Sequence, residues 1–317
     1  MATIGTNIGQ AKQLLKIGQL VAIPTETVYG LAANAFDIEA VTRIFDAKKR
    51  PTFDPLIVHT HSFETLNEFA ENIHPKLIKL AQIFWPGPLT LLLSKKSIIP
   101  DLVTSGLDRV GVRIPNHPLT LELLKQLPFP LAAPSANPFG YISPTSAKHV
   151  NDQLGSKIEY ILDGGSCQVG LESTIVGEEH GEIIIYRLGG LAIESIKEVI
   201  GDVSVQLNQS SNPKAPGQLK SHYAPKKPIF IGNITELIKR HADKKIGVIT
   251  FGDSHFSQSN IVIKNLSPTY NYKEAAINLF SFLRELDDSN VDIILCELLP
   301  EVNLGLAIND RLIRAAS

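Results

Sequence analysis

Two short segments, far apart in the chain, carry residue types that bind anions. One is Lys48-Lys49-Arg50-Pro51, with three cations at the expected end of a helix; the other is Ser135-Ala136-Asn137, followed by Ser143-Pro144-Thr145. Cations at a helix end commonly just compensate its dipole. Here two prolines in Pro51-Thr52-Phe53-Asp54-Pro55 stiffen the next loop, which indicates that the direction of the cations matters. The two segments together predict an anion site, best suited to a nucleotide phosphate.

The second segment follows an expected strand. Ser135-Ala136-Asn137 comes directly after the apolar Leu131-Ala132-Ala133, and open α/β sheets bind ligands at the carboxyl ends of their strands. We expect Ser143 to cap a helix that has Pro144 at its first position, and a helix N-terminus beside a second donor loop can hold phosphate. A simple turn and an ordinary cap explain the same residues without a ligand.

Other chemistry-bearing motifs are weaker. The segment Gly164 to Gly170, followed by Glu172-Ser173-Thr174, lacks the Walker A pattern. Cys167 has no basic neighbour in sequence that would make it a nucleophile. His59-Thr60-His61 would put two rings on one face of a strand, but no Cys or His cluster at usable spacing completes a structural zinc site. A Ser-His-Asp triad assembled in space stays open.

Hydrophobic periodicity predicts the elements that must position these residues. Helices and short strands alternate over the first two-thirds of the chain, which predicts an α/β domain with a mixed sheet. Residues 204–227 are rich in Ser, Asn, Gln and Pro and hold four lysines and no acid, as is typical of a linker. Strands and helices then restart as a small α/β unit with a Rossmann-like order but no G-x-G-x-x-G turn. We therefore predict a catalytic domain over 1–203, a linker over 204–227 and a C-terminal domain over 228–317.

Composition excludes some classes of protein. The 317 residues are 44% hydrophobic and 20% charged, as in ordinary globular proteins, and the net charge of −2 counts against a protein that coats nucleic acid. No apolar run approaches the ~20 residues that span a bilayer, and the N-terminus does not resemble a signal peptide. The two cysteines, Cys167 and Cys296, fall in different predicted domains. We therefore expect no disulfide, no membrane contact and a cytoplasmic location.

Many short segments recur in one order along nearly the whole chain, and as a set they resemble the threonylcarbamoyl-AMP synthase family in its two-domain form, with a YrdC-type catalytic domain. These segments are Pro24-Thr25-Glu26-Thr27-Val28-Tyr29-Gly30-Leu31, Lys48-x-Arg50-Pro51, Pro55-Leu56-Ile57-Val58-His59, Trp85-Pro86-Gly87-Pro88, Val112-Arg113-Ile114-Pro115, Ala133-Pro134-Ser135-Ala136-Asn137, Ser143, Glu172-Ser173-Thr174-Ile175-Val176, Arg187-Leu188-Gly189, Ala215-Pro216-Gly217 and His222-Tyr223-Ala224-Pro225. Each segment alone is weak evidence, whereas the ordered set is specific.

The resemblance implies a fold and a reaction. The fold is a YrdC-like twisted mixed sheet with a concave active site, plus a small Rossmann-like C-terminal domain. L-threonine, bicarbonate or CO₂, and ATP give threonylcarbamoyl-AMP and pyrophosphate, with Mg²⁺ accompanying ATP and no metal site built by the protein. The product passes to a separate tRNA threonylcarbamoyl transferase, so weak or no direct tRNA binding is expected.

The resemblance also implies residue roles. Lys48 and Arg50 are the catalytic cations, Arg as a planar fork and Lys as a point charge. The residues implied to bind ATP are Arg50, Asp54, Ser135, Asn137, Ser143 and Arg187. Those implied to bind threonine are Thr27, His59, Arg113 and Ser173, with Arg113 contacting the threonine carboxylate. His222 and Tyr223 are implied to form a lid over the site. The chain departs from the family where Asp54 replaces the usual Asn, and where Ala133 and Arg109 replace hydroxyl residues.

Two other functions stay open at this stage. One is a tRNA- or double-stranded-RNA-binding module without adenylating activity, although the small net charge and the lack of an aromatic RNP-like motif count against it. The other is the carbamoyl-adenylating domain of hydrogenase-maturation proteins, which carry acylphosphatase and zinc-finger segments that this chain lacks. Pyrophosphate release that needs threonine separates the family's reaction from both.

Overall fold

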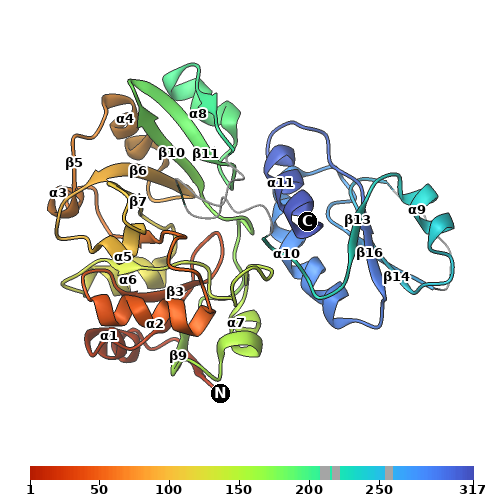
Figure 1. The fold of residues 1–317 in the computed structure, drawn as a ribbon, viewed down its shortest axis with the longest axis horizontal. Coiled ribbons are helices and arrows are strands. Elements are labelled where there is room, and N and C mark those ends of the chain that lie inside the picture. Colours follow the sequence, from red (N-terminus) through yellow and green to blue (C-terminus); the bar gives the residue numbers. More distant parts are fainter. Residues whose placement is uncertain (208–214, 216–221, 254–259) are drawn as a thin grey trace.

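The computed structural model describes residues 1–207, 215, 222–253 and 260–317. They form two α/β lobes that lie side by side, with α10 and α11 of the smaller lobe at the junction (Figure 1). The predicted fold class, a mixed-sheet domain with a small second α/β domain, is confirmed. In the part of the chain described here, no helix combines the length and the apolar character needed to cross a membrane.

The larger lobe contains the elements up to β12. Its helices are α1 (Ile8–Lys16), α2 (Ile38–Lys48), α3 (Leu66–Phe69), α4 (Pro75–Phe84), α5 (Asp101–Thr104), α6 (Pro118–Lys125), α7 (Ala147–Leu154) and α8 (Ile193–Ile200). Its strands are β1 (Thr3–Gly5), β2 (Val21–Ile23), β3 (Gly30–Asn34), β4 (Ile57–His59), β5 (Ala70–Glu71), β6 (Leu89–Lys95), β7 (Arg109–Arg113), β8 (Leu131–Ala132), β9 (Tyr160–Leu162), β10 (Thr174–Glu179), β11 (Glu182–Arg187) and β12 (Ser204–Val205).

The large sheet brings together chain segments that are distant in sequence. Its strand order is β1-β9-β2-β3-β8-β4-β7-β6-β10-β11-β12, and β5 pairs with β6. Strands β4 and β7 are parallel, and their register sets His59 beside Arg113. Strand β8 is antiparallel to both β3 and β4, and an isolated bridge beyond it joins Gly30 to Ser135. The centre of the sheet therefore gathers several predicted site residues at one edge.

The smaller lobe is a four-stranded parallel sheet with helices on both faces. It comprises β13 (Ile229–Ile231), α9 (Ile234–Arg240), β14 (Ile246–Thr250), β15 (Ile261–Asn265), α10 (Tyr272–Asp288), β16 (Ile293–Cys296) and α11 (Gly305–Ala315), in the strand order β13-β16-β14-β15. Helix α9 packs on one face of the sheet. The buried faces of α10 and α11 share a continuous apolar core with the larger lobe, running through Tyr223, Phe280 and Leu312. This shared core holds the two lobes together.

Helices and short strands alternate along the larger lobe, as predicted. Asp37 caps α2, because its carboxylate accepts hydrogen bonds from the backbone N–H groups of Glu39 and Ala40. The prediction for Ser143 is wrong: α7 begins at Ala147, its cap is Ser146, and Ser143 is fully buried. The hydroxyl of Ser143 instead donates a hydrogen bond to the carboxylate of Glu172, which is distant in sequence and could not be identified from the local pattern.

The predicted linker contacts the folded lobes wherever it is described. Ser204–Val205 is β12, paired with β11 at the edge of the large sheet. Ala215 is fully buried in an apolar cluster of the larger lobe with Ile57, Leu92 and Tyr186. From His222 onward the chain crosses to the smaller lobe, where the backbone N–H of His222 donates to the carbonyl of Arg314 at 3.2 Å. The remaining linker residues, 208–214 and 216–221, lie outside the described residues.

Candidate active site

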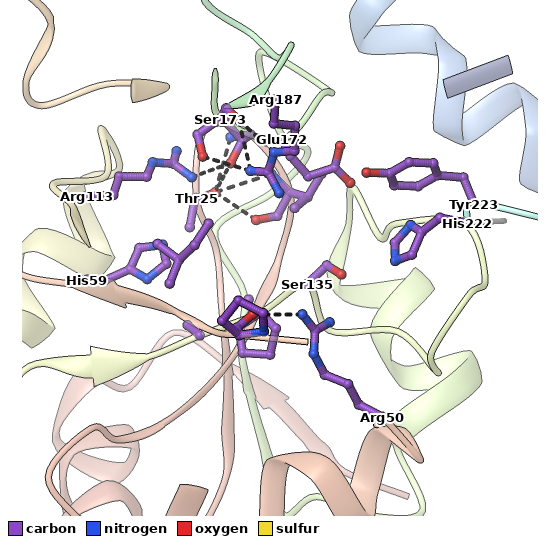
Figure 2. Close-up of a pocket in the computed structure, with 17 residues that line it drawn as sticks. Thr25, Arg50, His59, Arg113, Ser135, Glu172, Ser173, Arg187, His222 and Tyr223 are labelled. Carbon is purple, nitrogen blue, oxygen red and sulfur yellow. Dashed lines mark hydrogen bonds between the residues drawn. The ribbon is translucent and has the colours of Figure 1, made fainter. Parts of the chain in front are cut away.

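A cavity of about 50 Å³ is lined by residues of the larger lobe and by His222 and Tyr223 of the linker (Figure 2). Nine of the predicted site residues line it, and four do not. Those that line it are Thr27, Arg50, His59, Arg113, Ser135, Ser173, Arg187, His222 and Tyr223; those that do not are Lys48, Asp54, Asn137 and Ser143. One residue of each predicted segment, Arg50 and Ser135, therefore lines the same cavity.

At one end of the cavity, Arg113 is held rigidly at the end of β7. Its Nη2 lies 2.7 Å from a carboxylate oxygen of Glu26, its Nη1 donates to Thr27 Oγ1 at 2.8 Å, and its Nε donates to the carbonyl of Gly87 at 3.1 Å. Burial and the neighbouring Arg113 lower the pKa of His59 to about 3, so this ring is neutral. This end therefore combines a fixed cation, a hydroxyl and a neutral imidazole.

A second cation, Arg187, comes from the β10–β11 hairpin. Its Nε and Nη2 donate to the carbonyl of Ser173 at 3.1 and 2.9 Å, and Nη2 also lies 3.1 Å from the hydroxyl of Ser173. That hydroxyl is in turn 2.7 Å from Thr90 Oγ1. Burial lowers the pKa of Arg187 to about 10, which leaves the guanidinium charged at neutral pH. The hairpin therefore presents a preorganised cation next to a hydroxyl.

A third cation, Arg50, enters from the end of α2. Lys49 ends that helix in the left-handed conformation, with φ of 52°. The guanidinium of Arg50 then binds its own loop: Nε donates to the carbonyl of Asp54 at 3.1 Å and Nη2 to that of Pro55 at 2.9 Å, and Nη2 is also 2.9 Å from the Asp54 carboxylate. The loop that follows the helix therefore holds this guanidinium in one direction.

Lys48 and Asn137 do not line the cavity. The ammonium of Lys48 donates to the carbonyls of Ser135, at 2.6 Å, and of Asn137. The amide of Asn137 donates to the carbonyls of Pro138 and Tyr141, at 2.9 and 2.7 Å. Burial lowers the pKa of Lys48 well below its usual value. The two residues shape the loop that presents Ser135, and their contact with a substrate stays a prediction.

Sequence reasoning assigned no role to Glu172, which also lines the cavity. One carboxylate oxygen accepts the hydroxyl of Ser143 at 2.5 Å, and the other lies 3.0 Å from Nε of Arg311 in the smaller lobe. A Cβ at Gly189 would lie 2.2 Å from the carbonyl of Glu172, so the Arg-Leu-Gly segment needs glycine to pack beneath this acid. Burial alone would raise the pKa of Glu172, but Arg311 and Arg187 hold it below its usual value.

Two residues of the linker close the cavity on the side of the smaller lobe (Figure 2). The Tyr223 ring is 1% exposed and stacks on Phe280 of α10, with ring centroids 5.4 Å apart. The guanidinium carbons of Arg311 and Arg314 lie 5.2 and 5.0 Å from the centroid of the same ring. The ring of His222 stands edge-on to Tyr223 at 4.1 Å. This wall of the cavity is therefore seated on α10 and α11.

The site offers cations and hydroxyls rather than metal ligands. Within residues 1–207, 215, 222–253 and 260–317, no group of three or more His, Cys, Asp or Glu side chains could hold a metal ion. Strand β4 ends at His59, so His61 does not share its strand face. The arrangement suits an anionic substrate with a carboxylate at the Arg113 end and further negative charge near Arg50 and Arg187.

Comparisons with known proteins agree with this geometry. Residues 13–189 match the Sua5/YciO/YrdC family model, described as telomere recombination, and residues 191–317 match the threonylcarbamoyl-AMP synthase C-terminal domain. Threonylcarbamoyl-AMP synthase of Pyrococcus abyssi is 43% identical, over 96% of this chain and 93% of the relative. That of Bacillus subtilis is 38% identical, over 100% of this chain and 94% of the relative.

Solved structures show the same fold. The crystal structure of P. abyssi Sua5 complexed with L-threonine superimposes with a TM-score of 0.92 and 40% identity, covering 99% of this chain and 97% of that one. Escherichia coli YciO, at 19% identity and a TM-score of 0.52, covers 60% of this chain and 96% of its own, and is similar in fold alone. The likeness to P. abyssi Sua5 therefore extends over both lobes.

Proposed function

The chain belongs to the threonylcarbamoyl-AMP synthase family and forms threonylcarbamoyl-AMP for tRNA modification, and we propose that it does so from L-threonine, bicarbonate or CO₂, and ATP, releasing pyrophosphate. One observation carries the choice of substrates. A single cavity joins a fixed guanidinium suited to an amino-acid carboxylate, Arg113, to two more suited to polyphosphate, Arg50 and Arg187.

The reaction requires little covalent participation by the protein. The amine of threonine adds to CO₂ and loses a proton, which gives a carbamate. A carbamate oxygen then forms a bond to the α-phosphorus of ATP while the bond from that phosphorus to the pyrophosphate oxygen breaks. Pyrophosphate leaves with the electron pair. Positioning and stabilisation of developing negative charge therefore supply the catalysis.

At the threonine end, Arg113 binds the substrate carboxylate, and Thr27 and Ser173 supply hydroxyl groups. The support is that Arg113 and Thr27 are already hydrogen-bonded to each other at 2.8 Å, so little ordering remains to be done on binding. The neutral His59 suits a place next to an amine that must itself be neutral to attack CO₂. The P. abyssi relative, which was crystallised with L-threonine, supports threonine as the amino acid.

At the nucleotide end, Arg50 and Arg187 neutralise the phosphates, and Ser135 holds the nucleotide. Lys48, Asn137 and Ser143 act on the nucleotide through the loops they order, and Asp54 acts through Arg50. Mg²⁺ accompanies ATP and neutralises part of its charge. Glu172, which lines the cavity, and Glu26, which pairs with the cavity residue Arg113, are bound by guanidinium groups at 3.0 and 2.7 Å, so the ion would rest on phosphate oxygens and water.

His222 and Tyr223 act as a lid. A cavity of about 50 Å³ is far smaller than the ~300–1,000 Å³ typical of ligand sites, so these side chains must withdraw to admit ATP. Their return would exclude water and protect the mixed anhydride of the product from hydrolysis. The product then passes to a separate tRNA threonylcarbamoyl transferase in the cytoplasm, and the net charge of −2 fits weak or no direct tRNA binding by this chain.

The test is pyrophosphate release from ATP, measured with and without L-threonine and bicarbonate. We expect release only with both, and losses of about 100-fold or more in kcat/KM for Arg50→Ala, since each lost charge-assisted contact costs about 3 kcal/mol. Ser135→Ala should lose about 5- to 10-fold. Lys12→Ala, on the exposed surface of α1, is the matched control and should act like the wild type. RNA binding without threonine-dependent turnover would refute the proposal.

A further inference from the structure

Arg311 of α11 is a fully buried arginine that reaches from the smaller lobe into the larger one. Its Nε lies 3.0 Å from the Glu172 carboxylate, and its Nη2 donates to the carbonyl of Leu188 at 2.8 Å. Its Nη1 is 2.6 Å from Asp310 on its own helix. Figure 1 shows α11 at the junction between the lobes. A buried charge is costly unless it is paired, so this side chain commits α11 to one position over the site.

The partner of Arg311 is an acid in a cavity that receives anions. Glu172 lines the cavity beside Arg187, and both are drawn around the same space in Figure 2. An unneutralised carboxylate there would repel ATP and would also attract Arg187, the cation that the phosphates need. Arg311 removes both problems, because it supplies the opposite charge from outside the cavity. It also lies 5.2 Å from the centroid of Tyr223, the ring that closes the site.

We propose that Arg311 is a positioning residue of the nucleotide site: it neutralises Glu172 from the smaller lobe, so that Arg187 stays directed toward the phosphates of ATP. This inference rests on the proposed function, because it takes ATP as the ligand of that end of the cavity. It gives the C-terminal domain a defined part in the reaction, since one of its side chains completes the charge balance of a site built by the other domain.

The inference has a consequence for pH. The groups that face Glu172 are Arg311 from α11, Arg187 from β11, Tyr223 from the linker and the hydroxyl of Ser143. Burial raises the pKa of Glu172 and Arg311 is the strongest influence that lowers it, so Arg311→Met should raise that pKa. Below the new pKa, Glu172 is neutral and does not repel the phosphates of ATP. Above it the acid is charged, draws Arg187 and weakens ATP binding.

The experiment compares ATP binding by titration calorimetry, from pH 6 to 9, in the full-length wild type, Arg311→Met, and Arg311→Met combined with Glu172→Gln. Arg311→Met should weaken ATP binding about tenfold or more at pH 8 and less at pH 6, as expected when one partner of a buried charge pair is removed. The double variant should return to within about threefold of the wild type at every pH, because the charge of Glu172 is removed together with that of its partner and Asp310 keeps Arg314 at 3.5 Å. In the pyrophosphate assay, KM for ATP should rise while KM for threonine stays within about twofold.

Arg284→Met is the matched control for loss of domain docking. Arg284 is also a nearly buried arginine of the smaller lobe, and it donates to the carbonyls of Ile142 and Ser143 rather than to Glu172. Removing the Arg284 side chain should lower the melting temperature without a pH-dependent loss of ATP binding affinity. If Arg311→Met does not unfold cooperatively, Arg311→Lys and Arg311→Gln are compared instead. The lysine variant keeps the positive charge and should keep the affinity for ATP, whereas the glutamine variant should lose both.

Equal weakening by Arg311→Met and Arg284→Met at every pH, or no recovery with Glu172→Gln, would overturn the inference and leave Arg311 as a docking contact. Failure of the proposed function is separate from this result. A wild-type chain that binds ATP but releases no pyrophosphate with threonine refutes the reaction, and the ATP titrations still decide the role of Arg311. A wild-type chain that does not bind ATP refutes both.

Discussion

Replacing Asp54 by asparagine should strengthen ATP binding and weaken the folded state. The substitution keeps the shape of the side chain and an acceptor oxygen, and it removes one negative charge. That charge is paired with Arg50 at 2.9 Å, and the two side chains are only 0% and 5% exposed, so solvent screens the pair little. In the wild type, ATP must therefore compete with Asp54 for the positive charge of Arg50.

The size of each effect follows from the contacts. Removing one partner of a buried pair costs about 3–5 kcal/mol when the other charge is left uncompensated. Arg50 keeps two carbonyl partners, at 3.1 and 2.9 Å, so we expect a loss of only about 1–2 kcal/mol, or roughly 1.5–3 °C in Tm. A carboxylate about 7 Å from a phosphate charge repels it by about 2 kcal/mol at an effective dielectric constant of about 20. Allowing for Mg²⁺, ATP binding should tighten by about tenfold.

Titration calorimetry with ATP and a melting curve measure the two effects in one preparation. Asp101→Asn is the matched control: it removes the same charge from a side chain that is 83% exposed and paired with Lys95, and it should change neither value appreciably. Weaker ATP binding by Asp54→Asn would refute the reasoning. It would mean that the carboxylate holds Arg50 in its working orientation, or meets the nucleotide itself.

Three further predictions concern stability and reactivity. Ser143→Ala removes the hydroxyl that Glu172 accepts at 2.5 Å, and urea unfolding should show a loss of about 1.5–3 kcal/mol; no loss would contradict the importance of this bond. Burial lowers the pKa of His59 to about 3, against about 6.5 unfolded, so below about pH 6.5 only the unfolded state gains this proton. Stability should therefore fall as pH falls from about 6.5 toward 3, and His59→Gln should flatten that slope in urea melts; an unchanged slope would exclude His59 as a source. Burial raises the pKa of both Cys167 and Cys296, so mass spectrometry should find iodoacetamide adducts at pH 8 only after unfolding; rapid native alkylation would contradict the burial.

Much of the fold could be predicted because its signals are local. The α2 cap depends on Asp37 and the two residues that follow it within one turn, and the buried strands are marked by short apolar runs. Strand β3 was not predicted, since Gly30–Asn34 consists mostly of small residues with little strand preference. The start of α7 was misplaced by three residues, because Ser143 and Ser146 are both good caps in sequence and only packing chooses between them.

The candidate site divides in the same way. The sequence by itself determined that Arg50 would be directed by its loop, since its partners Asp54 and Pro55 lie within five residues and the prolines restrict the backbone between them. Only the tertiary structure decided that Lys48 binds the Ser135 loop from behind and that Glu172 is neutralised by Arg311, 139 residues further along the chain. Such pairings depend on how sheets and lobes pack, and a buried charge takes the partner that packing brings within reach.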